Sequence, residues 1–384
     1  MISEIEYKPY KELEYSSLIL NFKINNVLMN AIRRTILNDI PTYAIPRELI
    51  KIETDTTIYN RDQLTLRLSQ LPVLDIDTGL SYLEPEYYEK KYDDLTRKIH
   101  PNEKDIKFYV HGKNNDILKK YITTNDLVCY IDGKKIETKY SKKYPILLTV
   151  LRKDEEIDLN MKAVIGCGLK EVRWCPVSKC YFTYEDDAND CKLYIYSKGQ
   201  ISEYDIIRKA LENIIFKLNE NKLIIHNFIN DFLDNQKNNI DNYINKENNK
   251  NKKNINDDEK DINEEEKEKN KKGINLNLKN NKIDYDNEED EEKKKEEIEE
   301  NELVEKIKIT FDNLTIGLIL NYFLQNDSKL FLSGIYRPTY LLDKAILIIK
   351  YSKDTNIIDV IDNNIDKAIN LFNDLLKQIN KIKH

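Results

Sequence analysis

A long charged tract, residues 246–301, separates a longer first part of the chain from a shorter second part. Acidic residues outnumber lysines there, and most of the net charge of -7 lies within it. Its few apolar or aromatic side chains are Ile255, Ile262, Ile274, Leu276, Leu278, Ile283, Tyr285 and Ile298. So little apolar surface does not offset an ordering entropy of about 1–2 kcal/mol per residue. We predict a disordered acidic, Asn/Lys-rich linker over residues 236–301, the alternative being an acidic interaction tail.

Two segments before the tract share the apolar spacing of an amphipathic helix. The first contains Val27, Leu28, Ala31, Ile32, Thr35 and Ile36, and the second contains Ile206, Ile207, Ala210, Leu211, Ile214, Ile215 and Leu218. Asn25 or Asn26 is a suitable cap for the first helix, and Pro41 follows it. Ser202 with Asp205 makes a start like a capping box for the second. Upstream, Leu18, Leu20, Phe22 and Ile24 alternate as a half-buried strand does.

The same order of elements returns after the tract. Ile307, Ile309 and Phe311 alternate as a strand, and a helix is predicted from residue 314 to about residue 325. A turn at Ser333-Gly334 and a buried strand at residues 345–351 follow. A long amphipathic helix is then predicted from Ile358, Ile361, Ile365, Ala368, Phe372, Leu375 or Leu376, Ile379 and Ile382.

The predicted fold class is α+β, with two modules that each carry two helices on a small antiparallel sheet. The first module is discontinuous, residues 1–53 and 194–235. A β-rich insertion, residues 54–193, interrupts it, with turns predicted at His111-Gly112 and Asp132-Gly133. The second module is residues 302–384. Because two helices on a small sheet leave apolar surface uncovered, we expect the modules to pair with each other, within one chain or between chains.

Composition excludes several classes of protein. No apolar run approaches the roughly 18 residues that a membrane-spanning helix needs. Residues 1–15 are acidic and lack the apolar region of a signal peptide, so we expect an intracellular, non-secreted protein. Five cysteines without secretory features favour a reducing compartment. Outside the charged tract the net charge is close to zero, which is not typical of a protein that grips nucleic acid by itself.

Several short motifs carry a resemblance to a known family. The sequence NAIRR at residues 30–34, followed by IPTYAI at residues 40–45, resembles the NALRR…IPTMAI signature of the alpha-like RNA polymerase subunits. In the same family, residues 62–72 resemble E-x-I-A-H-R-L-G-L-I-P, and residues 166–177 resemble G-x-G…H-A-K-W-S-P-V. The members it resembles are bacterial alpha, the larger member of the archaeal D/L pair and the third-largest subunit of polymerase II.

The second part of the chain resembles the small alpha-like partner, which is the smaller member of the archaeal D/L pair or the eleventh polymerase II subunit. Residues 312–320 are similar to D-H-T-L-G-N-L-L, and residues 331–338 are similar to F-x-G-Y-x-x-P-H-P. A chain that joins both partners resembles the form found in some large DNA viruses. This resemblance implies a place in a viral factory and virion if the protein is viral, and in the nucleus otherwise.

The resemblance implies a non-catalytic assembly subunit of a multisubunit DNA-directed RNA polymerase. Its partners would be the two largest subunits and small polymerase subunits, with DNA reached only through the complex. The polar side of the first helix, with Arg33 and Arg34, would dock on the second-largest subunit, a role that suits the planar arginine fork. The candidate subunit interface comprises Asn30, Arg33, Arg34, Arg67, Leu314, Gly317, Leu318, Tyr322, Phe372 and Leu376.

The sequence gives little support for a metal, catalytic or cofactor site. Family members often carry a cysteine-rich metal loop, but residues 75–105 contain no cysteine, so we expect no zinc there. Cys175 and Cys180 are spaced more widely than a C-x2-C pair, which favours buried thiols over a metal site. No motif for catalysis or for a cofactor is found. The alternatives are a free-standing regulatory protein that reuses the same modules, and a metal-dependent enzyme built on the insertion.

Overall fold

The computed structural model describes residues 2–9, 16–184, 187–258, 304–311, 313–339 and 344–382, without the side chains of residues 4, 5 and 232–258. Its first sheet has four antiparallel strands in the order β1-β2-β12-β11. These are β1 (Ile2–Lys8), β2 (Ser17–Phe22), β12 (Cys191–Ser197) and β11 (Val177–Tyr184). Alternate residues of β2 and β12 point into the core, as the predicted strand pattern requires.

Two helices pack on this first sheet. Helix α1 (Asn26–Asn38) begins where the Asn25 side chain accepts a hydrogen bond from the Val27 backbone N–H at 3.0 Å. It ends before Pro41, with Asp39 as its C-cap. Helix α3 (Glu203–Asp258) begins where the Ser202 hydroxyl accepts a hydrogen bond from the Asp205 backbone N–H at 3.2 Å. Both predicted helices are therefore confirmed, including the capping residue of each.

The insertion is a second body of antiparallel strands. Its larger sheet has the order β3-β10-β5-β7-β8, with β4 also paired to β10. The strands are β3 (Thr42–Ala44), β4 (Ile50–Asp55), β5 (Ile106–Lys113), β7 (Leu127–Ile131), β8 (Lys134–Ile136) and β10 (Glu156–Gly166). A smaller sheet pairs β6 (Lys120–Thr123) with β9 (Leu147–Leu151). Helix α2 (Arg61–Ser69) packs beside these strands, and a separate hydrophobic cluster fills their centre.

Both boundaries of the insertion and one turn within it differ from those predicted. Strands β3 and β4 pair with β10, so the insertion body begins near Thr42 and not at residue 54. Strand β11 and the start of β12 pair within the first sheet, so the insertion body ends near Gly166 and not at residue 193. His111-Gly112 is not a turn but part of β5, where the two residues pair with Asp158 and Ile157 of β10. The Asp132-Gly133 turn is present and joins β7 to β8, with both residues at positive φ.

The last part of the chain repeats the strand and helix order of the first. It contains β13 (Val304–Phe311), α5 (Leu314–Gln325), β14 (Leu330–Tyr336), β15 (Ala345–Ser352) and α6 (Ile357–Ile382). The strands form one antiparallel sheet in the order β13-β15-β14. The turn predicted at Ser333-Gly334 is wrong, because both residues pair with β15 inside β14. The mixed α+β class with antiparallel sheets is confirmed.

The predicted linker begins as helix. Helix α3 continues to Asp258, so residues 236–258 are helical, not disordered. Extending a helix that is already formed avoids the cost of nucleation, which explains how a polar sequence continues it. Residues 259–301 lie outside the described residues. No helix in the described part of the chain combines the length and apolar character needed to cross a bilayer.

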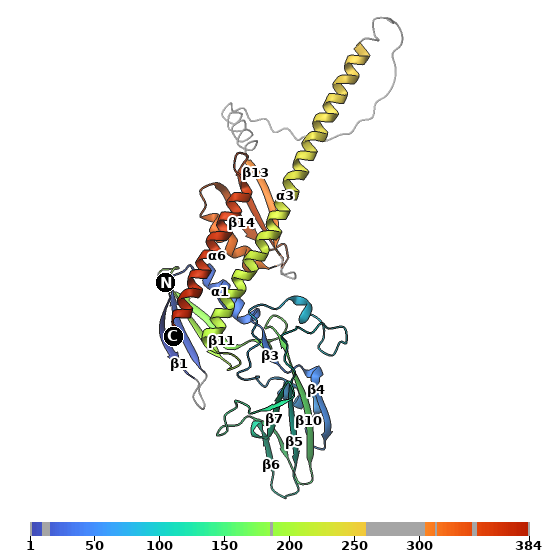
Figure 1. The fold of residues 1–384 in the computed structure, drawn as a ribbon, viewed down its shortest axis with the longest axis vertical. Coiled ribbons are helices and arrows are strands. Elements are labelled where there is room, and N and C mark those ends of the chain that lie inside the picture. Colours follow the sequence, from blue (N-terminus) through green and yellow to red (C-terminus); the bar gives the residue numbers. More distant parts are fainter. Residues whose placement is uncertain are drawn as a thin grey trace, which may run out of the picture.

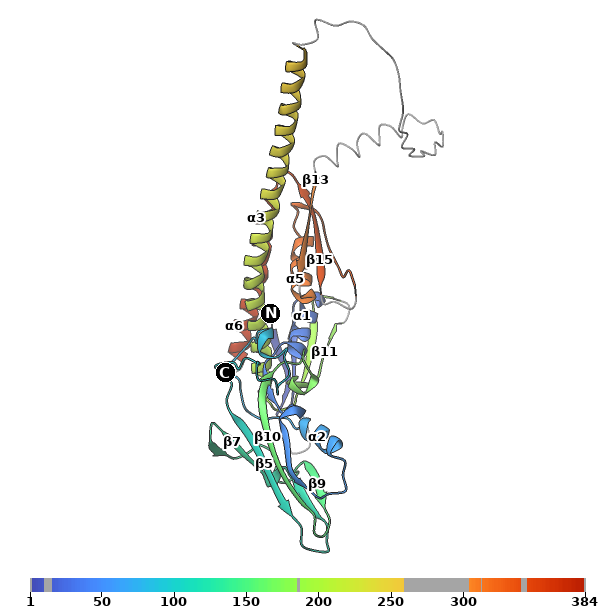
Figure 2. The ribbon, with the colours of Figure 1, turned by 90° about the vertical axis from the view of Figure 1, so that its right-hand side faces the viewer.

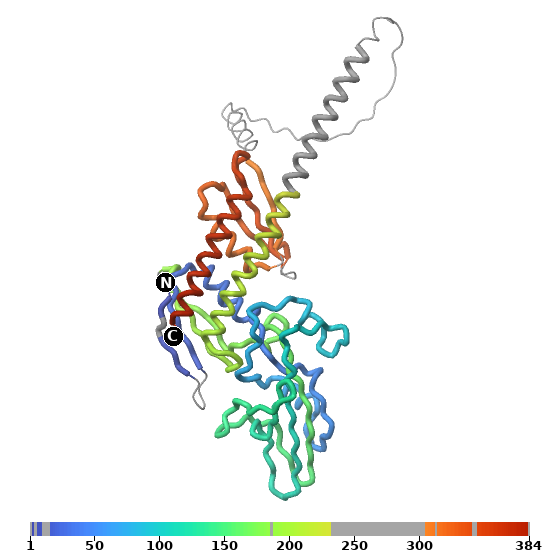
Figure 3. Tube along the Cα trace, in the orientation of Figure 1, coloured from blue at the N-terminus to red at the C-terminus, as the bar shows by residue number. Residues whose placement is uncertain are grey.

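The helices of the two parts lie together. Figure 1 shows α3 and α6 side by side, and Figure 2 shows α1 and α5 between that pair and the strands. Strand β1, near the start of the chain, lies against the last turns of α6 (Figure 3). The insertion extends away from this helical layer at one end of the molecule (Figure 1).

Candidate functional site

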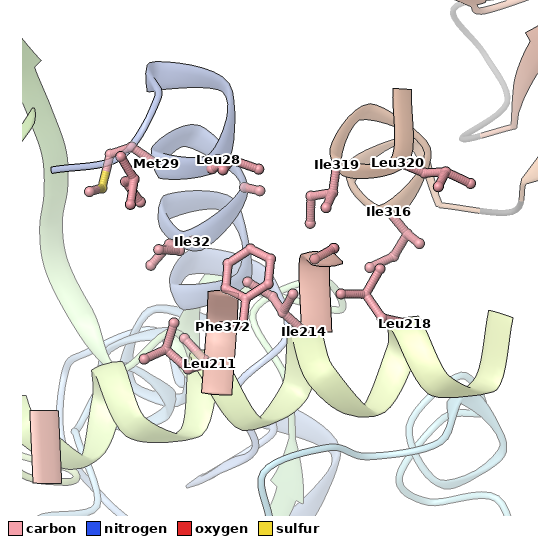
Figure 4. Close-up of a cluster of buried hydrophobic side chains, with 14 of the residues drawn as sticks. Leu28, Met29, Ile32, Leu211, Ile214, Leu218, Ile316, Ile319, Leu320 and Phe372 are labelled. Atoms are coloured by element: carbon pink, nitrogen blue, oxygen red, sulfur yellow. The ribbon is translucent and has the colours of Figure 1, made fainter. Parts of the chain in front are cut away.

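A single hydrophobic cluster joins the two parts of the chain. It draws buried side chains from α1 and α3 of the first part and from α5 and α6 of the second. Figure 4 shows Leu28, Met29, Ile32, Leu211, Ile214, Leu218, Ile316, Ile319, Leu320 and Phe372 around one centre. Since Phe372 is fully buried there, the two parts share one core and do not merely touch. We call this cluster the four-helix interface.

Polar contacts also cross between the two parts. The Arg34 guanidinium Nε on α1 donates a hydrogen bond to the Thr315 hydroxyl on α5 at 3.1 Å. Lys222 Nζ on α3 forms an ion pair with Asp366 Oδ1 on α6 at 2.7 Å. Partly exposed pairs of this kind contribute little free energy, typically below about 1 kcal/mol. They fix the register of the helices, while the apolar core supplies most of the stabilisation.

The candidate residues of the first part fall into two places. Asn30, Arg33 and Arg34 lie together on α1, and the Asn30 side-chain oxygen accepts hydrogen bonds from Arg33 at 2.9 and 3.1 Å. Arg34 is directed toward α5, as described above, and both arginines are half-buried. Arg67 lies apart from them, exposed on α2 in the insertion. The predicted docking role of these residues remains a prediction.

The candidate residues of the second part differ in their environments. Phe372 is at the centre of the four-helix interface, and Tyr322 and Leu376 pack against it. Gly317 faces its own sheet, because a Cβ at this position would lie 2.5 Å from Ile335 Cδ1. Leu314 and Leu318 are half-buried on α5. Gly317 thus allows α5 to approach its own sheet closely.

A buried lysine that the sequence pattern did not reveal ties α3 to the insertion. Lys209 lies among the apolar positions of α3, and its side chain is 2% exposed. Its Nζ forms an ion pair with Asp77 Oδ1 at 2.6 Å and donates a hydrogen bond to the Leu80 carbonyl at 2.7 Å. Beside it, the Asn213 side chain donates to the Ser81 carbonyl at 2.8 Å. These bonds hold residues 77–81 against the helix.

This ion pair predicts a pH dependence of stability. Burial alone would raise the pKa of Asp77, but the Lys209 contact and the Gly79 backbone N–H hold that pKa below its ordinary value. A carboxyl group whose pKa is lowered by folding stabilises the fold at pH values above its ordinary pKa. This stabilisation is lost as the pH falls through the folded-state pKa. At pH values below about 4, we expect the free energy of unfolding to decrease less in Asp77→Asn than in the parent protein. Urea unfolding at pH 3 and pH 6 measures the decrease for each protein. Identical decreases in both proteins would contradict the assignment of this pH dependence to the Asp77–Lys209 ion pair.

Gly166 and Gly168, the two glycines of the family-like segment 166–177, allow close packing. A Cβ at Gly168 would lie 2.0 Å from the Leu37 carbonyl oxygen at the end of α1. A Cβ at Gly166 would lie 2.7 Å from the fully buried Trp174 ring. The Trp174 indole donates a hydrogen bond to the Val164 carbonyl at 3.0 Å. The motif therefore joins the insertion to α1 through backbone contact.

The cysteine-free loop of the insertion contains a buried ion pair. Arg97 Nη2 lies 2.8 Å from Glu103 Oε2, and both side chains are nearly inaccessible to solvent. The Arg97 guanidinium also lies 4.8 Å from the centroid of the Tyr92 ring, which stacks on Trp174. These contacts cross-link residues 92–103 to the insertion body.

Each of the five cysteines is buried and has no disulfide partner. Burial raises the pKa of Cys129 and of Cys180, which disfavours the thiolate form that zinc binds. Within the described residues, no group of three or more His, Cys, Asp or Glu side chains is arranged to hold a metal ion.

The chain thus consists of two α+β parts that share one helical core. Its class is that of proteins built on paired dimerisation modules. The model of the RNA polymerase Rpb3/Rpb11 dimerisation domain matches residues 20–218, and the chain belongs to this family. The resemblance to the alpha-like RNA polymerase subunits is thereby confirmed.

The similar proteins are named as RNA polymerase subunits. The chain is 28% identical over 249 residues to a DNA directed RNA polymerase subunit of Acanthamoeba polyphaga mimivirus, covering 56% of this chain and 65% of that protein. It is 25% identical over 168 residues to subunit 3B of the DNA-directed RNA polymerases IV and V of Arabidopsis thaliana, covering 42% and 50%. The chain therefore spans less than two thirds of each of these relatives.

Proposed function

We propose that this chain is a non-catalytic assembly subunit of a multisubunit DNA-directed RNA polymerase. In it, one polypeptide supplies both members of an alpha-like pair. The first module consists of β1, β2, α1, β11, β12 and α3, and the second consists of residues 304–382. The observation that carries the proposal is the four-helix interface, in which both modules contribute to one buried core.

Pairing within one chain has a physical advantage for a scaffold. A tether between the modules makes their association intramolecular, which raises the effective concentration of each module at the other. The resulting platform would bind the two largest polymerase subunits and small subunits, and would contact DNA only through the complex. Its contribution would be positioning, with no chemical step of its own. The protein would be located where viral or nuclear transcription takes place.

The polar side of α1 is the proposed contact with the second-largest subunit. Arg33→Glu is the cleaner probe, because the hydrogen bonds of Arg33 remain within α1 whereas Arg34 also bonds to Thr315. We expect Arg33→Glu to weaken capture of that subunit by at least about tenfold, since truncating a charged interface contact typically costs about 2 kcal/mol or more. Pulldown with the tagged full chain measures it.

The control for this experiment carries the same charge change elsewhere. Lys134→Glu alters an exposed lysine in the β7–β8 hairpin, far along the insertion from α1. Arg34→Glu should also weaken capture, with an additional loss of thermal stability from the broken Thr315 contact. Capture by Arg33→Glu that equals capture by Lys134→Glu and by the parent protein would count against this docking surface.

A further inference from the structure

The outer face of the larger insertion sheet carries aromatic and basic side chains. Phe108 of β5 is buried in the insertion core, so its neighbours Lys107 and Tyr109 lie on the opposite face of the sheet. Lys107 is opposite Tyr130 of β7, and Tyr109 is opposite Val128. Tyr109 is 36% exposed, and Tyr130 and Val128 are half-buried. Together Tyr109, Tyr130 and Val128 form a partly exposed surface that we call the tyrosine patch.

Lysines lie on both sides of the tyrosine patch. Lys135 of the edge strand β8 is opposite Tyr130, and Lys162 of β10 is opposite Lys107. The Nζ atoms of Lys107 and Lys162 share one carboxylate and lie 2.7 and 3.3 Å from the Asp105 oxygens. Among the described residues, Lys135 has no ion-pair partner. Its ammonium group is therefore available to a ligand.

The positive charge continues past Lys135. Residues 134–143 contain five lysines and a single acid, Glu137, which is paired with Lys142. The chain outside the charged tract is close to neutral as a whole, so this excess is a local feature of the insertion. A local concentration of one charge attracts ligands of the opposite charge. A polyanion is therefore the class of ligand that fits this surface.

Two hollows meet at the tyrosine patch. Lys107, Tyr109 and Tyr130 line a hollow of about 480 Å³, Lys135 lines another of about 590 Å³, and Val128 lines both. Each volume falls within the range of about 300–1,000 Å³ that is typical of ligand sites. Figure 1 shows β5, β7 and β10 in the part of the insertion that extends away from the helical layer. The surface is thus recessed, and it lies apart from the helices that join the two modules.

The geometry of the two tyrosines favours a ligand with flat rings. The ring centroids of Tyr109 and Tyr130 lie 5.6 Å apart, with the ring planes at 86°. In such a T-shaped pair the edge of one ring covers a face of the other, and the remaining ring faces are not covered by the pair. By contrast, Tyr181 and Tyr194 on the first sheet stack at 8° and cover each other's faces. Bases of a single-stranded nucleic acid stack on uncovered aromatic faces, while basic side chains contact the phosphates.

We propose that the tyrosine patch and the lysines beside it bind single-stranded nucleic acid, with bases against Tyr109 and Tyr130 and a phosphate beside Lys135. An acidic protein segment would use the lysines alone, whereas a nucleic acid uses the lysines and the rings together. The surface is separate from the proposed docking surface on α1. It adds a direct contact to the proposed assembly role, in which DNA is otherwise reached only through the complex.

Fluorescence anisotropy of the full chain with labelled oligonucleotides tests the proposal. The probes are oligouridylate and oligothymidylate of about twelve nucleotides, a length within the usual site size, and they distinguish RNA from DNA. We expect saturable binding of at least one of these single strands. Its affinity should exceed that of the corresponding duplex by at least about fivefold, because the bases of a duplex are already stacked on each other.

Replacement of Tyr109 tests the stacking contact. Tyr109→Val should weaken binding by at least about fivefold, since loss of one stacked base typically lowers affinity by about five- to 150-fold. Tyr109→Phe keeps the ring and should retain the binding. Tyr336→Ala is the matched control, because Tyr336 is 45% exposed on β14 in the second module, and it should leave binding unchanged. Thermal unfolding shows that each variant remains folded during the comparison.

Replacement of Lys135 tests the phosphate contact. For a single strand, the slope of log affinity against log salt concentration changes by about 0.7 for each phosphate contact. Lys135→Gln should therefore make this slope shallower by about 0.7 between about 50 and 200 mM salt. Lys308→Gln removes an exposed lysine of β13 and should leave the slope unchanged.

Three results would overturn the proposal. The first is the absence of saturable binding for both single strands. The second is equal weakening of binding in Tyr109→Val and Tyr336→Ala, which would exclude stacking on the tyrosine patch. The third is binding of polyglutamate as tightly as of the single strands, with the same loss in Tyr109→Val, which would assign the surface to acidic protein segments.

Discussion

Replacing Phe372 by alanine is expected to lower the free energy of unfolding by about 3–5 kcal/mol, the usual cost of truncating a fully buried phenylalanine. Phe372 lies at the centre of the four-helix interface, surrounded by side chains from both modules. The variant loses the transfer free energy of the ring and leaves a cavity between helices that only partly collapse. Urea unfolding followed by circular dichroism measures the change.

The control for Phe372 lies on the exposed side of the same helix. Lys377 forms an exposed i,i+3 pair with Asp374, so Lys377→Ala should change stability by less than about 0.5 kcal/mol. If the modules share one core, Phe372→Ala also shifts the unfolding of the first module. Unchanged unfolding of that module, or a loss below about 1 kcal/mol, would contradict a shared core.

Replacing Gly168 by alanine is the second change with a large expected effect. The new Cβ would lie 2.0 Å from the Leu37 carbonyl oxygen, so the backbone of the insertion has to move away from α1. The same movement strains the hydrogen bond from the Leu169 N–H to the Asn38 carbonyl, 2.8 Å long. We expect a loss of about 1–3 kcal/mol or more, because backbone atoms yield less readily than flexible side chains.

Gly334 provides the comparison for Gly168. A Cβ at Gly334 meets no heavy atom within 4 Å, although the residue lies inside β14. Gly334→Ala should therefore be neutral or slightly stabilising, since alanine restricts the unfolded chain more than glycine does. Thermal unfolding of the two variants separates close contact from the general effect of losing a glycine. Equal melting temperatures would contradict the close contact at Gly168.

The helices and strands of the core were the most predictable part of the fold. The spacing that placed Leu28, Ile32 and Ile36 on one face also places them in the core, because burial on one side is what creates that spacing. The caps at Asn25 and Ser202 were recognisable because they act within a few residues.

Turns and boundaries that depend on distant pairing were not predictable in the same way. Gly112 and Gly334 suggest turns locally, yet both lie in strands whose partners are far along the chain or beyond a loop. Lys209 is an unusual residue for a buried helix face, and its partners at Asp77 and Leu80 come from a distant segment. Short-range patterns do not contain such information.

The candidate interface was only partly accessible to sequence reasoning. Phe372 follows from helix periodicity, and its place in the four-helix interface agrees with the pattern. The contact of Arg34 with Thr315 did not follow, because it depends on how the two modules are oriented. The role of Gly317 in its own module was equally hidden, since only the packing of α5 on β14 reveals it.

Purification of the tagged full chain from cells or virions in which it is naturally made tests the central claim most directly. We predict that it co-purifies in a fixed ratio with two very large polypeptides that peptide mass spectrometry identifies as the catalytic polymerase subunits. Recovery of the chain alone, or with partners unrelated to transcription, would contradict the assembly role and favour a free-standing interaction protein.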